Sequence, residues 1–317
     1  MKNDKKKRNI VIVLAVVAII FVFSFARGIG GAVSTGDIDY DKPVESFSVI
    51  SISGTIQGSP SSPLDSVSYD HTALMNYVDE LIEDESNKGI LLKVNSGGGT
   101  VYHSDEMYLK LMEYKEKTGR PIQAYFERTA ASGAYYISCA ADYISANRNC
   151  WTGSIGVILS YTNAKGLYDK LGLEEVIIST GANKGMGSMG SELTDEQRRI
   201  YQSLVDESYE RFTDIVATAR KMDIEDVKTL ADGRVYTAKQ ALENGLIDAV
   251  GSYEEAVQKM EDETGVPRYE KHFYKEVSLL DYIFMGIEKA FPKSDMQIIE
   301  NLASSQLAGV PLYYYRQ

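Results

Sequence analysis

The chain contains little cysteine, histidine or proline: two cysteines, three histidines and seven prolines among 317 residues. The histidines are scattered and no paired Cys/His spacing occurs, so the sequence predicts neither a metal site nor a cofactor. Cys139 and Cys150 could form a disulfide outside a cell, but their apolar surroundings favour buried free thiols. Common phosphate-binding loops are excluded as well, because neither GxxxxGKS/T nor a helix-opening GxGxxG is present.

Positive charge is also scarce, with 33 Lys and Arg against 45 Asp and Glu and a formal net charge of −12. Several of the cations lie at the N-terminus, so the remainder of the chain is more acidic still. Such a surface does not attract nucleic acid or anionic lipid headgroups, and it keeps a domain soluble. The charge balance therefore argues against a nucleic-acid partner.

One long apolar run is present, at the N-terminus. Residues 10–26 carry no charge; five cations precede them, whereas only Arg27 follows closely. The run is just long enough to span a membrane, and the charge bias predicts the N-terminus inside and the remainder outside. A cleaved signal peptide is the alternative, because Ser24-Phe25-Ala26 loosely resembles a cleavage site. The length favours a retained anchor within residues 1–27, followed by a tether at 28–45.

Beyond the tether, short apolar runs alternate with segments of helical periodicity, which predicts an α/β fold with a helical C-terminal half. We expect one domain over residues 46–264, followed by a C-terminal extension and tail over 265–317. In such folds, sites gather at the carboxyl ends of strands. Strands are expected at 47–52, 89–94, 122–126, 142–146, 155–160 and 175–179, and helices at 72–84, 104–119, 134–141, 165–171, 194–222, 224–231, 238–244 and 253–263.

Ser132 is the candidate nucleophile. It lies at a predicted strand-to-helix turn, where Gly133 allows close backbone approach and the helix start directs amide hydrogens toward it. This setting suits a reaction that builds negative charge nearby. Serine at a helix start is also typical of a simple N-cap, and this stretch alone does not decide between the two interpretations.

A serine hydroxyl needs a base within hydrogen-bond reach. His103 follows a glycine-rich turn, but its place before a helix favours a solvated side chain. Lys184 lies in a glycine-rich segment with no other charge, where enclosure would strip its water and leave the amine neutral. The alternative is a flexible loop whose lysine points into water. Ser154 is the best-placed hydroxyl to hold a neutral amine.

The glycine-rich turn at residues 95–99 supplies a further element of the predicted site. It follows a buried strand, and such a turn can direct backbone amides at a developing oxyanion. By itself it is weak support, since most glycine-rich turns are only turns.

Five motifs in order make the sequence resemble the signal peptide peptidase A family, membrane-anchored bacterial serine peptidases of the Clp-protease/crotonase-like superfamily. The match covers residues 49–260, and the short form of the family has one such unit behind an anchor. In this chain the motifs are LKVNSGGGTVY at 92–102, AASGAYYIS at 130–138 with AAD at 140–142, TGSIGV at 152–157, GANK at 181–184, and DGRVY at 232–236 through GLID at 245–248.

The resemblance implies acyl transfer by a Ser/Lys dyad and a fold of repeated strand-strand-helix units. It implies Ser132 as nucleophile, Lys184 as general base, Ser154 as the hydroxyl that orients the lysine, the amides of Gly99 and Gly133 as the oxyanion hole, and Gly98 as the residue that shapes the turn. Gly97 departs from the pattern, because the family usually has proline there, and the missing φ restraint loosens the turn.

The same resemblance implies hydrophobic peptide substrates, such as signal-peptide remnants, and a homo-oligomeric ring, octameric in the short form, with composite sites between neighbours. Two other functions stay open: a catalytically silent membrane-anchored scaffold, and acyl-CoA chemistry, which an outward-facing domain disfavours. The apolar residues 310–315 suggest that the tail lies in a substrate groove as an internal inhibitor. The alternative is that the tail simply packs on the domain.

Overall fold

A computed structural model describes residues 44–58, 69–271 and 312–314 of the chain. The predicted anchor at residues 10–26 and residues 28–43 of the predicted tether lie outside the described residues. Within the described part, no helix combines the length and apolarity needed to cross a membrane.

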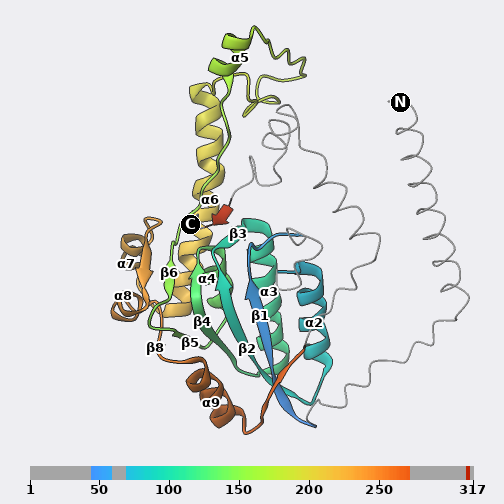
Figure 1. Ribbon diagram of the computed structural model, residues 1–317, viewed down its shortest axis with the longest axis vertical. Helices are drawn as coiled ribbons and strands as arrows, with labels where there is room; N and C mark the ends of the chain where they lie inside the picture. The colour runs from blue at the N-terminus through green and yellow to red at the C-terminus, as the bar shows by residue number, and fades with distance from the viewer. Residues whose placement is uncertain (1–43, 59–68, 272–311, 315–317) are drawn as a thin grey trace, which may run out of the picture. The chain divides into compact units, whose positions relative to one another are not determined.

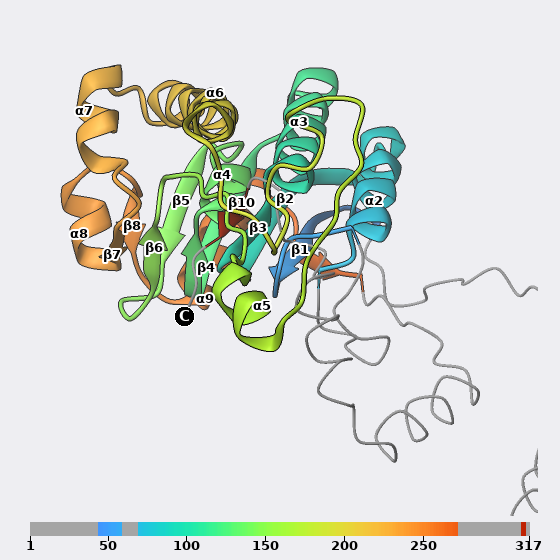
Figure 2. The same ribbon diagram turned by 90° about the horizontal axis from the view of Figure 1, so that it is seen from above.

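The core of the fold is a mostly parallel β-sheet (Figures 1 and 2), with the strand order β7-β6-β4-β2-β1-β9; β5 also pairs with β4, and β8 pairs with β5. Every pairing in it is parallel except that of β6 with β7. The strands are β1 (Ser46–Ser53), β2 (Asn87–Ser96), β4 (Ile122–Ala131), β5 (Tyr143–Ala146), β6 (Trp151–Gly153), β7 (Val235–Thr237), β8 (Ala249–Val250) and β9 (Arg268–Glu270).

Helices cover both faces of the sheet, which explains why its central strands are apolar along their length. Alternate residues of a strand face opposite sides. Ile50 and Ile52 therefore join the larger core under α2, α3, α4 and α6, whereas Val49 joins a smaller core with Val257 and Met260 of α9. The helices are α2 (His71–Glu83), α3 (Val101–Thr118), α4 (Gly133–Ser138), α5 (Lys165–Leu171), α6 (Asp195–Arg220), α7 (Ile224–Leu230), α8 (Ala238–Glu243) and α9 (Tyr253–Thr264).

The long helix α6 joins the core only through its C-terminal half. Phe212 and Val216 are buried, whereas Leu204 is 44% exposed, so the apolar side of the helix is covered only in part. The segment 158–193, which includes α5, lies beside the start of α6, at the end away from the sheet (Figure 1). Side chains of this segment are mostly exposed.

Most predicted elements form, and the differences concern short strands. Residues 155–160 and 175–179 do not form strands; a strand needs a partner, and the second of these segments is solvent-exposed. Residues 151–153, which lie between two expected strands, instead pair with β4 as β6. Helix α3 is capped by Thr100 rather than Ser104, whose hydroxyl donates to the Thr100 carbonyl inside the first turn.

Both cysteines are free and buried, as the sequence predicted. Burial raises the pKa of the Cys139 and Cys150 thiols to about 12. Neither thiol is therefore a nucleophile at neutral pH.

Candidate active site

Ser132 lies where β4 ends and α4 begins, in a sparsely populated backbone conformation with φ 55° and ψ −119°. Its amide donates to the Gly153 carbonyl at 2.7 Å, and its carbonyl accepts from the Tyr136 amide at 2.9 Å. The side chain is buried and makes no capping hydrogen bond to α4. Backbone strain of this kind costs about 1–3 kcal/mol and concentrates at functional sites. Ser132 is therefore not a simple N-cap.

Sheet register brings Ser154 next to Ser132. Ala131 of β4 pairs with Gly153 of β6, so the two serines are the next residues along parallel neighbouring strands. Ser154 also has a positive φ, 49°, and its amide donates to the Arg234 carbonyl at 2.8 Å. The two positive φ values direct both serines out of the strand path at the carboxyl end of the sheet.

The glycine-rich turn forms a short strand, β3 (Gly98–Thr100), in front of α4. One edge of β3 is occupied by Ile56, whose amide donates to the Gly98 carbonyl at 3.0 Å and whose carbonyl accepts from the Thr100 amide at 2.9 Å. Because successive residues of a strand direct their amides to opposite edges, the Gly99 amide faces the other edge. The Gly98 amide donates to the Ser96 hydroxyl at 3.1 Å. Of the three glycines in the predicted oxyanion hole, Gly98 therefore shapes the turn.

Only glycine fits where this turn approaches α4. A Cβ atom on Gly98, whose φ is 97°, would lie 2.7 Å from the Gly133 nitrogen. A Cβ atom on Gly99 would lie 1.9 Å from the Ile56 carbonyl oxygen. Both contacts are closer than real side chains allow. Glycine at 98 therefore lets the turn touch the start of α4, and glycine at 99 lets Ile56 approach the turn.

The edge of β3 opposite Ile56 is paired with part of the tail. Strand β10 (Leu312–Tyr314) pairs antiparallel with β3, with Tyr313 opposite Gly99. The carbonyl oxygen of Tyr313 lies against Gly98 and Gly133. It would be 2.1 Å from a Cβ atom placed on Gly98 and 3.0 Å from one placed on Gly133. Residues 312–314 are thus extended as predicted, and their central carbonyl lies beside the residue that follows Ser132.

The side chain of Tyr313 fills a buried aromatic pocket. Its ring stacks on Tyr136 of α4, with centroids 4.8 Å apart, and contacts Phe212 of α6 at 4.7 Å. Its hydroxyl donates to the Ser208 carbonyl at 2.8 Å. Burial raises the pKa of this phenol, which keeps the hydroxyl protonated as a donor. The sequence predicted an apolar tail but contained no indication of this pocket.

Lys184 is not next to Ser132 within one chain. Its side chain is exposed, and its loop is held to the start of α6 by Gln197, which donates to the Ala182 carbonyl, and by Tyr201, which donates to the Met186 carbonyl. The packing of α6 on α4 begins near residue 212, which is about 16–22 Å further along the helix at 1.5 Å per residue. Of the two alternatives for this loop, the single chain shows the solvent-facing one.

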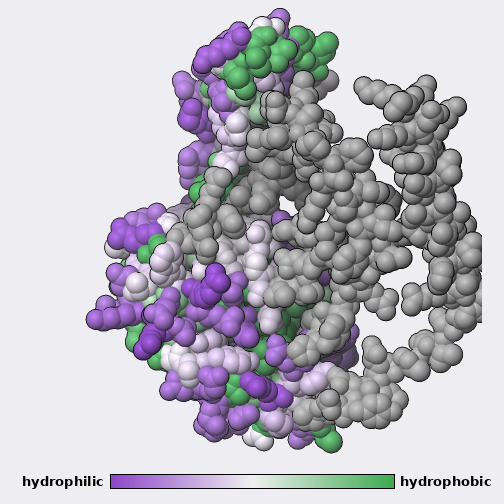
Figure 3. Space-filling view, in the orientation of Figure 1, coloured by the Kyte–Doolittle hydropathy of each residue, from purple (hydrophilic) through white to green (hydrophobic). Residues whose placement is uncertain are grey.

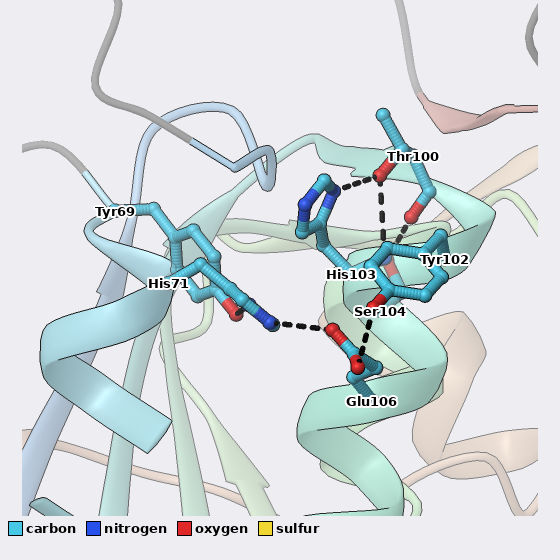
Figure 4. Close-up of polar contacts among 7 residues, drawn as sticks. All are labelled: Tyr69, His71, Thr100, Tyr102, His103, Ser104 and Glu106. Atoms are coloured by element: carbon cyan, nitrogen blue, oxygen red, sulfur yellow. Dashed lines mark hydrogen bonds and ion pairs between the residues drawn. The ribbon is translucent and has the colours of Figure 1, made fainter. Parts of the chain in front are cut away.

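His103 does not contact Ser132 either; it belongs to a polar cluster at the start of α3 (Figure 4). Its Nδ1 hydrogen-bonds with the Thr100 hydroxyl at 2.6 Å, and its ring meets that of His71 edge-on at 4.7 Å. His71 in turn binds Glu106 at 2.9 Å. Partial burial and the neighbouring His71 lower the pKa of His103. The cluster fixes the residues that follow the glycine turn.

Ser96 was not among the predicted site residues, although it lies within the first of the five motifs. Its buried hydroxyl donates to the Gly54 carbonyl at 2.5 Å and accepts from the Gly98 amide. The only signal in the sequence was its place directly before three consecutive glycines. Among the described residues, no cluster of His, Cys, Asp and Glu has a geometry that could hold a metal ion.

Comparison with known proteins shows which family and which relatives this sequence resembles. Residues 114–267 match peptidase family S49. Over 215 residues the chain is 41% identical to an Enterococcus faecium protein that carries the name of signal peptide peptidase SppA, a match that covers 68% of this chain and 62% of the relative. It is 37% identical over 179 residues to Protease 4 of Haemophilus influenzae, covering 56% of this chain and 29% of that protein.

A plant protein is also similar. The chain is 31% identical over 206 residues to the chloroplastic serine protease SPPA of Arabidopsis thaliana, covering 65% of this chain and 30% of the relative. The chain thus spans less than two thirds of the length of these relatives. Ser132, Ser154 and Lys184 all lie inside the region that matches the family, whereas the glycine turn precedes it.

Proposed function

We propose that the chain, whose residues 114–267 match peptidase family S49, is a serine peptidase whose nucleophile is Ser132. The observation that carries the proposal is the strained, uncapped Ser132 beside a glycine turn against which a backbone carbonyl already lies. The mostly parallel sheet, with this site at its carboxyl end, also supports assignment to the Clp-protease/crotonase-like class of repeated strand-strand-helix units.

The proposed reaction is acyl transfer. Ser132 Oγ attacks the carbonyl carbon of a peptide bond while its proton passes to the lysine amine, and the amides of Gly99 and Gly133 hold the resulting oxyanion. The C–N bond then breaks, and the lysine ammonium protonates the leaving amine. Water repeats the sequence on the acyl-enzyme, which frees the serine and releases the acid product.

A neighbouring chain supplies the base in this proposal. Lys184 is exposed on the segment beside α5, and that segment also presents apolar side chains to water (Figure 3), including Ile178 at 97% and Val176 at 74% exposure. An exposed apolar patch of this kind is typical of an interaction surface. Contact with a second copy would cover the patch and deliver Lys184 to the neighbour's Ser132, with the adjacent Ser154 orienting the amine. The assembly would be a ring with composite sites, octameric as in the short form of the family.

Hydrophobic peptides, such as signal-peptide remnants, are the proposed substrates. An extended peptide would add to the free edge of β3, as β10 does, and place an apolar or aromatic side chain between Tyr136 and Phe212. The tail would then compete with substrate as an internal inhibitor. The apolar residues 10–26 would anchor the chain in a bacterial membrane as a single span, with the catalytic domain on the extracytoplasmic side.

A direct test compares the full-length chain with its Ser132→Ala variant on a library of apolar peptides. We expect cleavage by the wild type and covalent labelling by an active-site serine reagent, and we expect the variant to lose both. Absence of cleavage and labelling in the wild type would support the silent scaffold instead. Hydrolysis of an acyl-CoA thioester without peptide cleavage would support the acyl-CoA alternative.

A further inference from the structure

Three consecutive glycines, Gly97, Gly98 and Gly99, carry the turn in front of Ser132. Glycine peptide units rotate at little steric cost, so the sequence of the turn does not itself determine which amide faces the substrate. Something outside the glycines must fix that direction.

The hydroxyl of Ser96 is placed to do so. Its oxygen accepts the Gly98 amide hydrogen at 3.1 Å, and its proton goes to the Gly54 carbonyl at 2.5 Å. Ser96 is buried at the end of β2, in register with Ala130 of β4, so its own position is set by the sheet. The hydroxyl therefore joins the glycine turn to a rigid strand and to the turn after β1.

Two hydrogen bonds at Gly98, one to Ser96 and one from Ile56, set the orientation of the neighbouring peptide units. With the Gly98 amide held toward Ser96, and the Gly98 carbonyl held by the Ile56 amide, the Gly99 amide is left on the opposite edge of β3. That edge is where the Tyr313 carbonyl lies. Without the Ser96 hydroxyl, the buried Gly98 amide would lose its hydrogen-bond acceptor. The turn would then rotate to bring this amide to another acceptor.

We propose that Ser96 is a positioning residue for catalysis: it engages the Gly98 amide and thereby aims the Gly99 amide at the oxyanion. The inference rests on the proposed peptidase function. In this proposal Ser96 neither contacts the substrate nor transfers a proton. It only fixes the position of the Gly99 amide, the donor that stabilises the transition state.

The effect should fall on the chemical step. Removing one oxyanion-hole donor lowers kcat about 100- to 1000-fold, so loosening the donor in Ser96→Ala should lower kcat by roughly 10- to 100-fold with little change in KM. Ser96→Thr keeps the hydroxyl and should recover most of the loss. A peptide aldehyde, which forms a tetrahedral adduct with a serine, should bind Ser96→Ala more weakly in proportion to the fall in kcat/KM.

Ser48→Ala is the matched control. Ser48 is another buried serine on the neighbouring strand β1, and its hydroxyl accepts from Tyr77 and Asn87 at 3.1 Å each. Its removal should lower the melting temperature but leave kcat unchanged. A purely structural role for Ser96 would make the two variants alike, with similar losses of stability and no specific loss of kcat or aldehyde affinity, and that result would overturn the inference.

Hydrogen exchange separates this inference from the proposed function. The Gly98 amide should exchange slowly in the wild type and in Ser96→Thr, and much faster in Ser96→Ala. Unchanged exchange at Gly98 would refute the tether whatever the activity. If exchange responds as expected but the wild type and Ser132→Ala are equally inactive, then the peptidase proposal fails and Ser96 positions no catalytic amide.

Discussion

At the scale of single residues, the candidate site is built from backbone conformations that most residues avoid. Ser132 and Ser154 have φ values of 55° and 49°, and Gly98 has 97°. For Ser132 the conformation frees the hydroxyl from helix capping, and for Gly98 it brings the turn against α4. The requirement at Gly98 is thus both conformational and steric, and the two parts can be separated by mutation.

Gly98→Ala should abolish most activity because its methyl group would overlap the place where the Tyr313 carbonyl lies and crowd the Gly133 amide. Gly119→Ala is the matched control: Gly119 has a φ of 67°, but nothing lies within 4 Å of the position that an alanine methyl group would take there. Both variants should lose about 1 kcal/mol or more of stability from the strained φ, measured by thermal unfolding. Only Gly98→Ala should lose peptide hydrolysis; equal activity in the two variants would contradict the steric argument.

His103 should make the chain less stable in mild acid. Burial and the neighbouring His71 lower its pKa below the ordinary value of 6.5, so the unfolded chain binds the proton more tightly than the folded chain does. Stability is therefore retained above about pH 6.5 and declines as the pH falls below it. The charged or titratable groups that face His103 are His71, Tyr102 and Glu106. The pKa of Glu106 is lowered: partial burial acts to raise it, but hydrogen bonds from Tyr102 and His71 outweigh this.

The measurement is the melting temperature between pH 7.5 and 5.5 in wild type and His103→Gln. The decline should be shallower in the variant, because glutamine cannot be protonated. Lys239→Gln, which removes a cation from the exposed face of α8, should follow the wild-type curve. A decline of equal steepness in His103→Gln would assign the acid sensitivity to other groups.

At the scale of elements, the sequence predicts the strands and helices that carry an apolar pattern. It misses the short strands that exist only through pairing with another segment. Strands β1 and β2 and helices α2, α6 and α9 carry long apolar patterns and form close to their expected bounds, whereas β4, expected at residues 122–126, continues to Ala131. Strand β6 has three residues and is defined by its pairing with β4 and β7, so its short local sequence carries no strand pattern. The pairing of β10 with β3 joins residues more than 200 positions apart, which no local pattern can indicate.

The same reasoning explains which residues of the candidate site the sequence predicted and which it did not. Ser132 and the turn of Gly97, Gly98 and Gly99 follow predicted strands, so strand prediction located them at one edge of the sheet. The strand that places Ser154, β6, was not predicted. Ser96 was missed because its role depends on Gly54, a residue of another turn. The position of Lys184 could not be predicted, because it depends on how the segment 158–193 is carried by α6 rather than on its own composition.

If strand β10 acts as an internal inhibitor, loosening it should raise activity. Tyr313→Ala removes the ring that fills the pocket of Tyr136 and Phe212, a contact that contributes several kcal/mol when fully buried. We expect faster cleavage of short peptides and faster labelling of Ser132 by a serine reagent. Leu242→Ala, at a residue of α8 that is 40% exposed, is the control and should change neither rate. An unchanged labelling rate in Tyr313→Ala would mean that the tail only packs on the domain.

At the scale of the whole molecule, the separation of Lys184 from Ser132 is the main constraint on mechanism. A dyad within one chain would require the loop of residues 180–190 to leave its contacts with Gln197 and Tyr201. A dyad between chains requires no such change, and it also accounts for the apolar side chains that the segment exposes. Head-to-tail contacts of this kind form a ring when the rotation between neighbours closes, and every site of such a ring would draw on two neighbours.

Complementation between two inactive variants distinguishes these arrangements. Ser132→Ala and Lys184→Ala should each be inactive alone. If each site combines the serine of one chain with the lysine of the next, random mixed rings should regain about one quarter of the wild-type sites, since each intact partner is present half the time. If the dyad lies within one chain, no mixed site is intact and no activity returns. The two variants are to be co-expressed with different affinity tags and purified through both, and peptide hydrolysis is to be measured against mixed wild-type rings prepared in the same way. Recovery near one quarter supports the composite site, and no recovery from verified mixed rings excludes it.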